Sequence, residues 1–227
     1  MERQVKPIVA ELVGTFVFFF IGAGAIVTDS KYHNVGLIGI ALAHGLALSI
    51  MISAFGATSG GHFNPAVTAS FLVTRRIKID TAIYYILAQL VGGTLAGLAL
   101  RAVFPESIWR VTHLGSPALA PGVSVGTAIF LEAVLTFFLV LAVFGTAVDA
   151  RAPKIGGFGI GLTVMMDILV GGPLTGAAMN PARAFGPQLA SGFWSDWYVF
   201  WIGPVIGGVV AALLYDTVIL GDDAQKA

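Results

Sequence analysis

The sequence contains no cysteine and very little charge. Of its 227 residues, 11% are charged and 57% are apolar, and the mean hydropathy is +0.90. Without cysteine, the chain can form neither a disulfide nor a thiolate metal site. The surface of a water-soluble protein of this size needs far more polar side chains, so the composition places the chain in a lipid bilayer.

The charges that are present balance, with 12 basic and 12 acidic residues. A net charge of zero gives no reason to expect binding to nucleic acid or to an acidic lipid surface. Catalytic patterns are also missing, because the motifs contain no Ser/His/Asp order, phosphate loop or metal cluster. We therefore expect a protein that is not an enzyme and that carries no cofactor and no metal.

Six apolar runs come close to the ~20 residues that a helix needs to cross ~30 Å of hydrocarbon. The first run begins at about Pro7 and has no small-residue cleavage site, so it predicts a spanning helix and not a removable signal peptide. The predicted spans cover residues 7–28, 36–57, 80–103, 123–147, 156–171 with some extension, and 197–220.

The tripeptide Asn-Pro-Ala occurs twice between these spans, at an offset of 180 − 64 = 116 residues. Each copy lies in an apolar stretch too short to cross a bilayer, and its proline suits the first position of a helix. Non-helical backbone is tolerated at membrane depth only where protein or water surrounds it. Both segments are therefore predicted to fold back into the protein as re-entrant half-helices. The two copies are Asn64, Pro65, Ala66 and Asn180, Pro181, Ala182.

The duplication extends into the spans. Glu11 in the first run and Glu132 in the fourth have similar neighbours, at an offset of 132 − 11 = 121 residues. Three spans per half is an odd number, so the second half must enter the membrane upside down relative to the first. We expect one channel domain over residues 1–227, with a half at 7–103 and an inverted half at 123–220, whose half-helices meet near the midplane.

Basic residues are unevenly divided between the two ends of the predicted spans. The end with the excess is predicted to be cytoplasmic. Both termini then lie in the cytoplasm, and we expect an integral, multi-pass protein of the plasma membrane. The cytoplasmic set is Arg3, Lys6, Arg75, Arg76, Lys78, Arg151, Lys154 and Lys226, and the outer set is Lys31, Arg101 and Arg110.

The half-helices would bring a specific electrostatic arrangement to the midplane. A helix N-terminus carries about +0.5 of an elementary charge, so two such ends facing one constriction repel cations, including hydronium. Asn64 and Asn180 would cap these ends and present amide N–H groups to a passing water, which would orient it and interrupt a proton wire. Unwound backbone would supply carbonyl acceptors, from Gly60, Gly61, His62, Phe63, Gly176, Ala178 and Met179.

Arg183 directly follows the second tripeptide, inside the membrane. A buried guanidinium group there costs at least ~2.5 kcal/mol and persists only beside a polar cavity or partner. We therefore expect the side chain of Arg183 to line a pore.

Over nearly its whole length, the sequence resembles the aquaporins, or major intrinsic proteins. The resemblance rests on Gly-Gly-His-Phe-Asn-Pro-Ala-Val-Thr at 60–68, Met-Asn-Pro-Ala-Arg at 179–183, the two intramembrane glutamates and the order of the spans. It implies an all-α membrane protein with six transmembrane helices, two re-entrant half-helices, an inverted internal repeat and a right-handed bundle. It also implies a homotetramer and a passive channel for water.

In that family, the arginine forms the narrowest constriction together with three other positions. By spacing from the tripeptides, the resemblance assigns these positions to His44, Ile168 and Ala177. The set departs from that of strict water channels and is similar to that of plant tonoplast intrinsic proteins, several of which pass ammonia or urea as well as water. Glycerol is disfavoured, since Ala184 stands where glycerol channels usually have Asp.

The resemblance gives Glu11 and Glu132 a bracing role, in which each accepts hydrogen bonds from the backbone of the re-entrant loop in its own half. We expect His62 to contribute its backbone carbonyl to the pore while its ring packs locally. His113 lies in a predicted long loop at about 104–122, from which it could reach an outer vestibule, although we expect it to be solvated.

The favoured interpretation is a passive, proton-excluding water channel that also admits small neutral solutes such as ammonia. One alternative is a broader channel for ammonia, urea and glycerol. Two others belong to different classes: a proton-coupled transporter using Glu11, Glu132 or Asp167, whose role stays open, and a junction protein that has kept the fold. Glycine pairs predict close helix packing. They are Gly93 and Gly97, Gly157 and Gly161, and Gly203 and Gly207.

Overall fold

The computed structural model describes residues 2–153 and 155–221, with side chains from Val5 onward. Three basic residues of the orientation prediction fall outside this description: Lys154, Lys226 and the side chain of Arg3. Within the described part, the regular structure is entirely helical. Among the described residues, six helices are long and apolar enough to span a membrane, two of them (α6 and α9) together with a π-helical turn that continues each. They are α1 (Glu2–Tyr32), α2 (Gly36–Ser59), α4 (Ile79–Val103), α6 (Val125–Val143), α7 (Phe158–Thr175) and α9 (Val199–Leu214).

These helices confirm the six predicted spans, with shifted ends. The turn between α1 and α2 is short because the carboxylate of Asp29 accepts hydrogen bonds from the backbone N–H groups of Val35 and Gly36, at 3.0 and 2.8 Å. At the opposite end of the bundle, α6 and α9 each continue as a π-helical turn, over Phe144–Val148 and Tyr215–Leu220.

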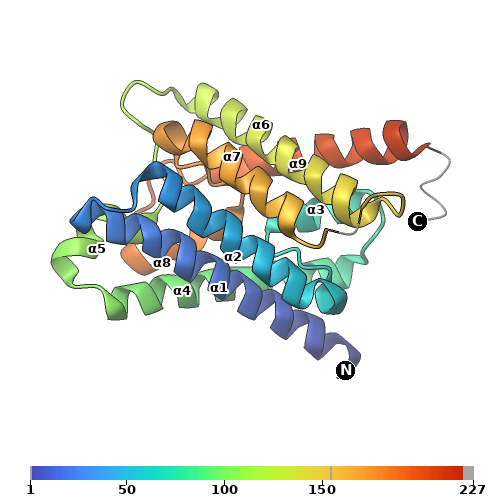
Figure 1. Ribbon diagram of the computed structural model, residues 1–227, viewed down its shortest axis with the longest axis horizontal. Coiled ribbons are helices and arrows are strands. Elements are labelled where there is room, and N and C mark those ends of the chain that lie inside the picture. The colour runs from blue at the N-terminus through green and yellow to red at the C-terminus, as the bar shows by residue number, and fades with distance from the viewer. Residues whose placement is uncertain (1, 154, 222–227) are drawn as a thin grey trace.

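Two shorter helices, α3 (Pro65–Val73) and α8 (Pro181–Ser191), are the predicted half-helices. Each begins at a proline. The side-chain oxygen of the asparagine before that proline accepts hydrogen bonds from backbone N–H groups of the first turn. In Figure 1, α3 lies toward the end of the bundle where α1 starts, and α8 lies toward the opposite end. The half-helices therefore enter from opposite sides, as the inverted repeat requires.

The segment expected to be a long loop, at about 104–122, contains a further helix. α5 (Glu106–Thr112) starts after Pro105, and a 3₁₀ turn over His113–Gly115 follows it. Packing against α1 holds this helix, with Trp109 buried. The loop prediction was wrong here, because a proline followed by an acidic residue is itself a helix-start signal.

His113 also differs from its prediction. Its ring is partly buried and stacks on Phe193, with centroids 3.9 Å apart and an interplanar angle of 4°. The expectation of a solvated loop histidine was therefore wrong. The stack joins the α4–α6 connection to the segment that follows α8.

Glycines bring the helix backbones into direct contact, which confirms the close packing predicted from the glycine pairs. A Cβ atom on Gly207 would lie 1.9 Å from the carbonyl oxygen of Ala133, so α9 touches the backbone of α6. A Cβ atom on Gly161 of α7 would lie 2.3 Å from the carbonyl oxygen of Gly45 in α2. Only glycine allows helices to approach this closely.

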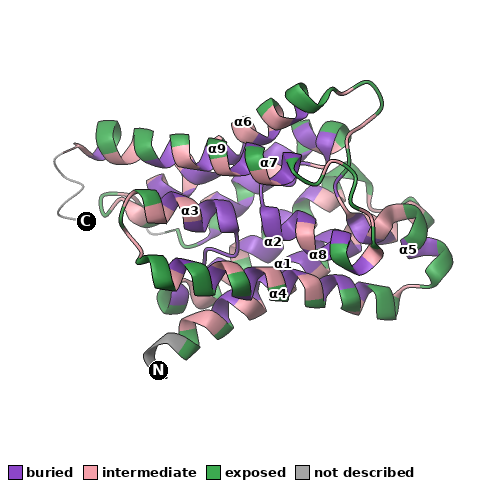
Figure 2. Cartoon of the chain, turned by 180° about the vertical axis from the view of Figure 1, so that it is seen from behind, coloured by how far each residue is buried: buried purple, intermediate pink, exposed green. Residues whose placement is uncertain are grey.

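The bundle is apolar outside and polar at selected points inside. Figure 2 shows buried residues concentrated between the helices and exposed residues along the outer faces. The outward faces carry large apolar side chains such as Phe130 and Val170, which are 70% and 64% exposed. Glu11, Gln89 and Glu132 are fully buried. This distribution suits a bilayer, where polar groups must be satisfied within the protein.

We expect Gly207→Ala to lower the free energy of unfolding by about 1–3 kcal/mol, because the new methyl group must displace the backbone of Ala133. The measurement is unfolding in mixed micelles of increasing SDS content, followed by tryptophan fluorescence. Gly126→Ala is the control, because the nearest atom to its Cβ would be 4.0 Å away. Equal stability of the two variants would contradict the packing argument.

Candidate functional site

Three cavities follow one another through the bundle. The middle one, here called the lumen, has a volume of ≈ 20 Å³ and is lined by both Asn64 and Asn180. The cavity next to the start of α8, here called the outer vestibule after the predicted orientation, has a volume of ≈ 280 Å³ and shares Arg183 with the lumen. The cavity next to α3, here called the inner vestibule, has a volume of ≈ 430 Å³ and shares His62 with the lumen. Since a cavity needs about 10–15 Å³ to hold one water molecule, the lumen has room for one or two at a time.

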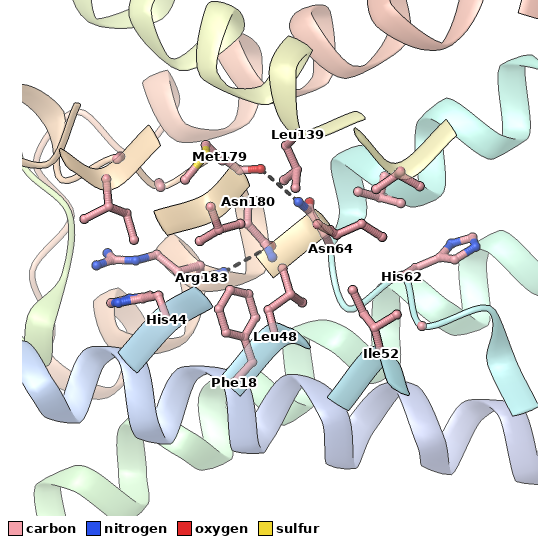
Figure 3. A pocket seen from close by; sticks show the side chains of 18 residues that line it. Phe18, His44, Leu48, Ile52, His62, Asn64, Leu139, Met179, Asn180 and Arg183 are labelled. Carbon is pink, nitrogen blue, oxygen red and sulfur yellow. Dashed lines mark hydrogen bonds between the residues drawn. The ribbon is translucent and has the colours of Figure 1, made fainter. Parts of the chain in front are cut away.

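The two asparagines tie the halves of the protein together across the lumen. The side-chain nitrogen of Asn64 donates to the carbonyl oxygen of Met179 at 2.8 Å (Figure 3). The side-chain nitrogen of Asn180 donates to the carbonyl oxygen of Phe63 at 2.9 Å. Each side-chain oxygen caps its own half-helix. Because a primary amide carries two N–H donors, each asparagine keeps one N–H for the lumen.

The loops before the half-helices adopt left-handed backbone at residues other than glycine. The angle φ is +47° at Phe63, +45° at Ala177 and +51° at Met179. Each such residue costs of order 1–3 kcal/mol and persists only where its surroundings fix it. A strong set of hydrogen bonds to these loops is therefore required.

Two buried carboxylates supply that set. Glu11 accepts from the two backbone N–H groups that precede Asn64, at 2.9 and 2.7 Å. Glu132 accepts from the two that precede Asn180, also at 2.9 and 2.7 Å. The hydroxyl group five positions before each asparagine donates to the same carboxylate, at 2.7 Å. These are the hydrogen bonds that the predicted bracing role requires.

The first half has an additional polar network behind its loop. The amide of Gln89 donates to Glu11 at 2.8 Å and to the hydroxyl of Thr68 at 3.0 Å. That hydroxyl lies 3.1 Å from Nδ1 of His62, whose ring packs on Phe71 with centroids 4.4 Å apart. The imidazole of His62 thus belongs to the packing around the loop.

The four residues predicted to form a filter lie together at the outer end of the lumen. His44 comes from α2, Ile168 from α7, and Ala177 and Arg183 from the second loop and the start of α8. All four line the lumen, and none is more than 3% exposed. In Figure 3, the imidazole of His44 and the guanidinium of Arg183 point into the same part of the cavity.

Hydrogen bonding determines what these two side chains offer. Nδ1 of His44 lies 2.9 Å from the carbonyl oxygen of Ile40. A carbonyl only accepts, so Nδ1 carries the proton and Nε2 is left as an acceptor. Nε and Nη1 of Arg183 have no hydrogen-bond partner among the described residues. Since buried donors need partners, the described residues satisfy the guanidinium of Arg183 only in part.

Sequence reasoning missed the apolar wall of the lumen. Leu48 and Ile52 follow His44 at intervals of four along α2, and a second row precedes Ile168 at the same interval along α7. Residues four apart share a helix face, so the spacing from the filter residues was a usable signal. The wall consists of Phe18, Leu48, Ile52, Val67, Leu139, Val143, Ile160 and Val164.

The residues predicted to supply carbonyl acceptors to the pore have different positions. Gly60 lines the inner vestibule and Gly176 the outer one. Phe63 lines none of the three cavities, and its carbonyl oxygen accepts from Asn180. Those that line the lumen are Gly61, His62, Ala178 and Met179.

Asp167, whose role the sequence left open, is buried next to the filter and outside the three cavities. It is 3% exposed, and its Oδ2 atom has no hydrogen-bond partner among the described residues. Its carboxyl group is therefore separate from the row of cavities.

Polar contacts tie the chain together beside the inner vestibule. Arg76, after α3, pairs with Asp216 at 2.8 Å, and the hydroxyl of Tyr215 donates to Asp149 at 3.1 Å. Hydrogen bonds from the side chain and backbone of Arg151 hold the pKa of the Asp149 carboxyl below its usual value. These contacts link the α6–α7 connection and the end of α9 to the rim of the vestibule.

Six spanning helices, two half-helices joined through their capping asparagines, and a connected row of cavities define a membrane channel. The sequence profile described as Major intrinsic protein matches residues 2–215. The chain belongs to this family, the aquaporin channels, which are not enzymes.

Individual relatives agree with this assignment. The chain is 44% identical to aquaporin TIP4-4 of Zea mays, over 98% of this chain and 90% of that protein. It is 39% identical to aquaporin-8 of Mus musculus, over 99% and 86%. Its structure is similar to the X-ray structure of the aquaglyceroporin from Plasmodium falciparum, with a TM-score of 0.81 and 25% identity over 99% of this chain and 100% of that one.

We expect Glu132→Gln to lower the free energy of unfolding by about 1–3 kcal/mol, because the amide leaves one buried loop N–H without an acceptor. Water permeability should fall as well, since the carbonyl oxygen that accepts the hydrogen bond from Asn64 belongs to Met179 in the same loop. Both effects are measured on purified protein, by SDS titration and by stopped-flow light scattering of proteoliposomes.

Glu106→Gln is the matched control, because Glu106 is exposed on α5 and its ion pair among the described residues is with Arg110, one turn away. Surface pairs of this kind contribute about 0–1 kcal/mol. If Glu132→Gln behaved like this control, the bracing role would be contradicted.

Proposed function

We propose that this protein is a passive channel that conducts water along an osmotic gradient, excludes protons, and admits small neutral solutes such as ammonia. The observation that carries the proposal is the lumen, where two asparagine amides with one free N–H each lie among apolar walls. Movement down a gradient through such a cavity requires neither catalysis nor coupling to another solute.

The narrowness of the lumen supports transport in single file. Apolar side chains offer no hydrogen bonds, so water molecules bind only at a few points along the path. Those points are the two asparagines near the centre, Arg183 with His44 at the outer end, and the backbone of the two loops where it lines the lumen. Few and weak binding points favour rapid passage, because a permeant must leave each site as readily as it enters.

Proton exclusion is supported by the same geometry. The N-termini of α3 and α8 face the centre of the path, and their partial positive charges disfavour hydronium. A water oxygen that accepts the free N–H groups of Asn64 and Asn180 directs its own hydrogens away from the centre. Such a water cannot accept a proton from a neighbouring water, which interrupts proton hopping.

The filter composition supports passage of ammonia alongside water. Nε2 of His44 can accept from an N–H of ammonia, and the guanidinium of Arg183, which lines the same part of the cavity, can donate to the lone pair of ammonia. Ile168 and Ala177 add no further polar requirement. Glycerol is much larger than the one or two waters that a cavity of ≈ 20 Å³ can hold, so its entry should be slow.

The experiment is stopped-flow light scattering of proteoliposomes under an osmotic gradient for water and under isosmotic exchange for glycerol. We expect rapid water-driven shrinkage and slow glycerol entry. Ala177→Trp should reduce water flux to the level of empty vesicles, because the indole fills the filter. Val170→Trp is the control, since Val170 lies on α7 two residues after Ile168 and is 64% exposed on the outer face of the bundle.

Other outcomes would contradict separate parts of the proposal. Glycerol entry as fast as water flux would show a broader channel, and an absence of water flux in correctly folded wild type would favour a junction protein. An entrapped pH dye, read under an imposed membrane potential, tests proton exclusion. Uphill solute movement driven by a pH gradient would instead show a proton-coupled transporter.

We further propose that the protein forms a homotetramer in the plasma membrane with both termini cytoplasmic. The excess of basic residues at the α3 end of the bundle, including Lys6 and Arg75, supports this orientation. Because the chain lacks cysteine, Lys6→Cys and Lys31→Cys report topology cleanly. A membrane-impermeant maleimide applied to intact cells should label only Lys31→Cys, and labelling of Lys6→Cys would contradict the orientation. Chemical cross-linking of the purified protein should give products of up to four chains, and products of no more than two chains would contradict the tetramer.

A further inference from the structure

Gly22 of α1 lies under the ring of His44, although Gly22 lines none of the three cavities. A Cβ atom on Gly22 would lie 2.4 Å from Cδ2, 2.5 Å from Nε2 and 2.8 Å from Cγ of His44. Atoms cannot approach this closely, so the ring occupies the space that any larger residue would fill. Gly22 has ordinary helical backbone, and what it provides is room.

The imidazole is enclosed on its other sides as well. Nδ1 is held by the carbonyl oxygen of Ile40, one turn earlier in α2. The ring of Phe18 meets it edge-on, with centroids 6.1 Å apart and an interplanar angle of 88°. Phe18 precedes Gly22 by four residues and so shares its face of α1. The imidazole also borders the cavity, where Arg183 lies (Figure 3).

A methyl group at Gly22 would therefore move the ring in a defined direction. Carbon atoms pack at about 3.5–4.0 Å, so a contact of 2.4 Å demands a shift of about 1 Å. The hydrogen bond to Ile40 and the edge of Phe18 oppose movement along α2 or α1. The ring must then move toward the lumen, which at ≈ 20 Å³ has no space to spare.

We propose that Gly22 is a positioning residue that sets the width of the channel at His44. The inference rests on the proposed role of His44 in the filter and adds a determinant that does not touch the permeating molecule. In this arrangement the selectivity of the site depends on the face of α1 that carries Phe18 and Gly22, as well as on the residues that line the cavity.

Gly24 provides the matched control on the same helix. A Cβ atom there would meet only the terminal Cδ2 atom of Leu100, at 3.2 Å, and a leucine end can move. Gly22→Ala and Gly24→Ala thus make the same chemical change two residues apart in α1. Only the first is directed at the ring of His44.

The experiment compares water and glycerol permeability of proteoliposomes for wild type, Gly22→Ala, Gly24→Ala, His44→Ala and the double variant Gly22→Ala/His44→Ala. We expect Gly22→Ala to reduce water permeability by about tenfold or more, because pore diameter limits passage. Gly24→Ala should match wild type. The double variant should recover the water permeability of His44→Ala, since the added methyl group then meets no ring.

Three results would contradict either the role of Gly22 or the proposed filter role of His44, and they tell the two apart. If the double variant stayed as impermeable as Gly22→Ala, the effect would not pass through His44 and the inference would fail. If Gly22→Ala conducted water like wild type, while His44→Ala raised glycerol entry, only the role of Gly22 would fail. If His44→Ala changed neither flux, the proposed filter itself would fail.

Folding is followed by size-exclusion chromatography of each variant in detergent. Should Gly22→Ala misfold while the double variant folds, the clash lies with His44 and the inference is supported. Should both misfold while His44→Ala folds, the methyl group meets something else and the inference is overturned.

Discussion

The rest of this structure depends on how two unwound loops are satisfied inside a membrane. Lipid offers no hydrogen bonds, so the N–H and C=O groups of these loops need partners within the protein. Glu11 and Glu132 accept the N–H groups, and the asparagine of each half donates to a carbonyl of the other half's loop. Because each loop is completed by the opposite half-helix, neither half of the repeat can form its part of the lumen alone.

The groups left over from this network are the ones that face the lumen. Each asparagine uses one N–H on the opposite loop and keeps another, and His44 uses Nδ1 on its own helix and keeps Nε2. Partial satisfaction is normally a cost in a protein interior. Here the unused groups border a cavity that a small polar molecule can enter. The structural hydrogen bonds fix where the unused N–H groups and Nε2 of His44 lie, and whether each is a donor or an acceptor.

The sequence was informative where local chemistry is distinctive and uninformative where it is uniform. The length of the apolar runs identified the spans, and the two Asn-Pro dipeptides identified both half-helices. The apolar wall has no distinctive residue type of its own, because the lipid-facing Val170 and the lumen-facing Val164 are valines of one largely apolar helix, and only the spacing of four from the predicted filter residues marks it. The stack of His113 on Phe193 joins residues 80 positions apart (193 − 113 = 80), and no local pattern encodes it.

In a lumen this small, the packing of the surrounding helices determines the width of the path. His44 projects from α2 and Ile168 from α7, and these helices touch where Gly45 meets Gly161. A backbone contact of this kind leaves no freedom for the helices to approach further, so it fixes one dimension of the filter from outside it. Gly22 affects the width on the side of His44, because the imidazole ring occupies the space that a side chain on Gly22 would fill. Residues with no side chain can therefore determine what passes, because a change of about 1 Å matters in a space that holds one or two waters.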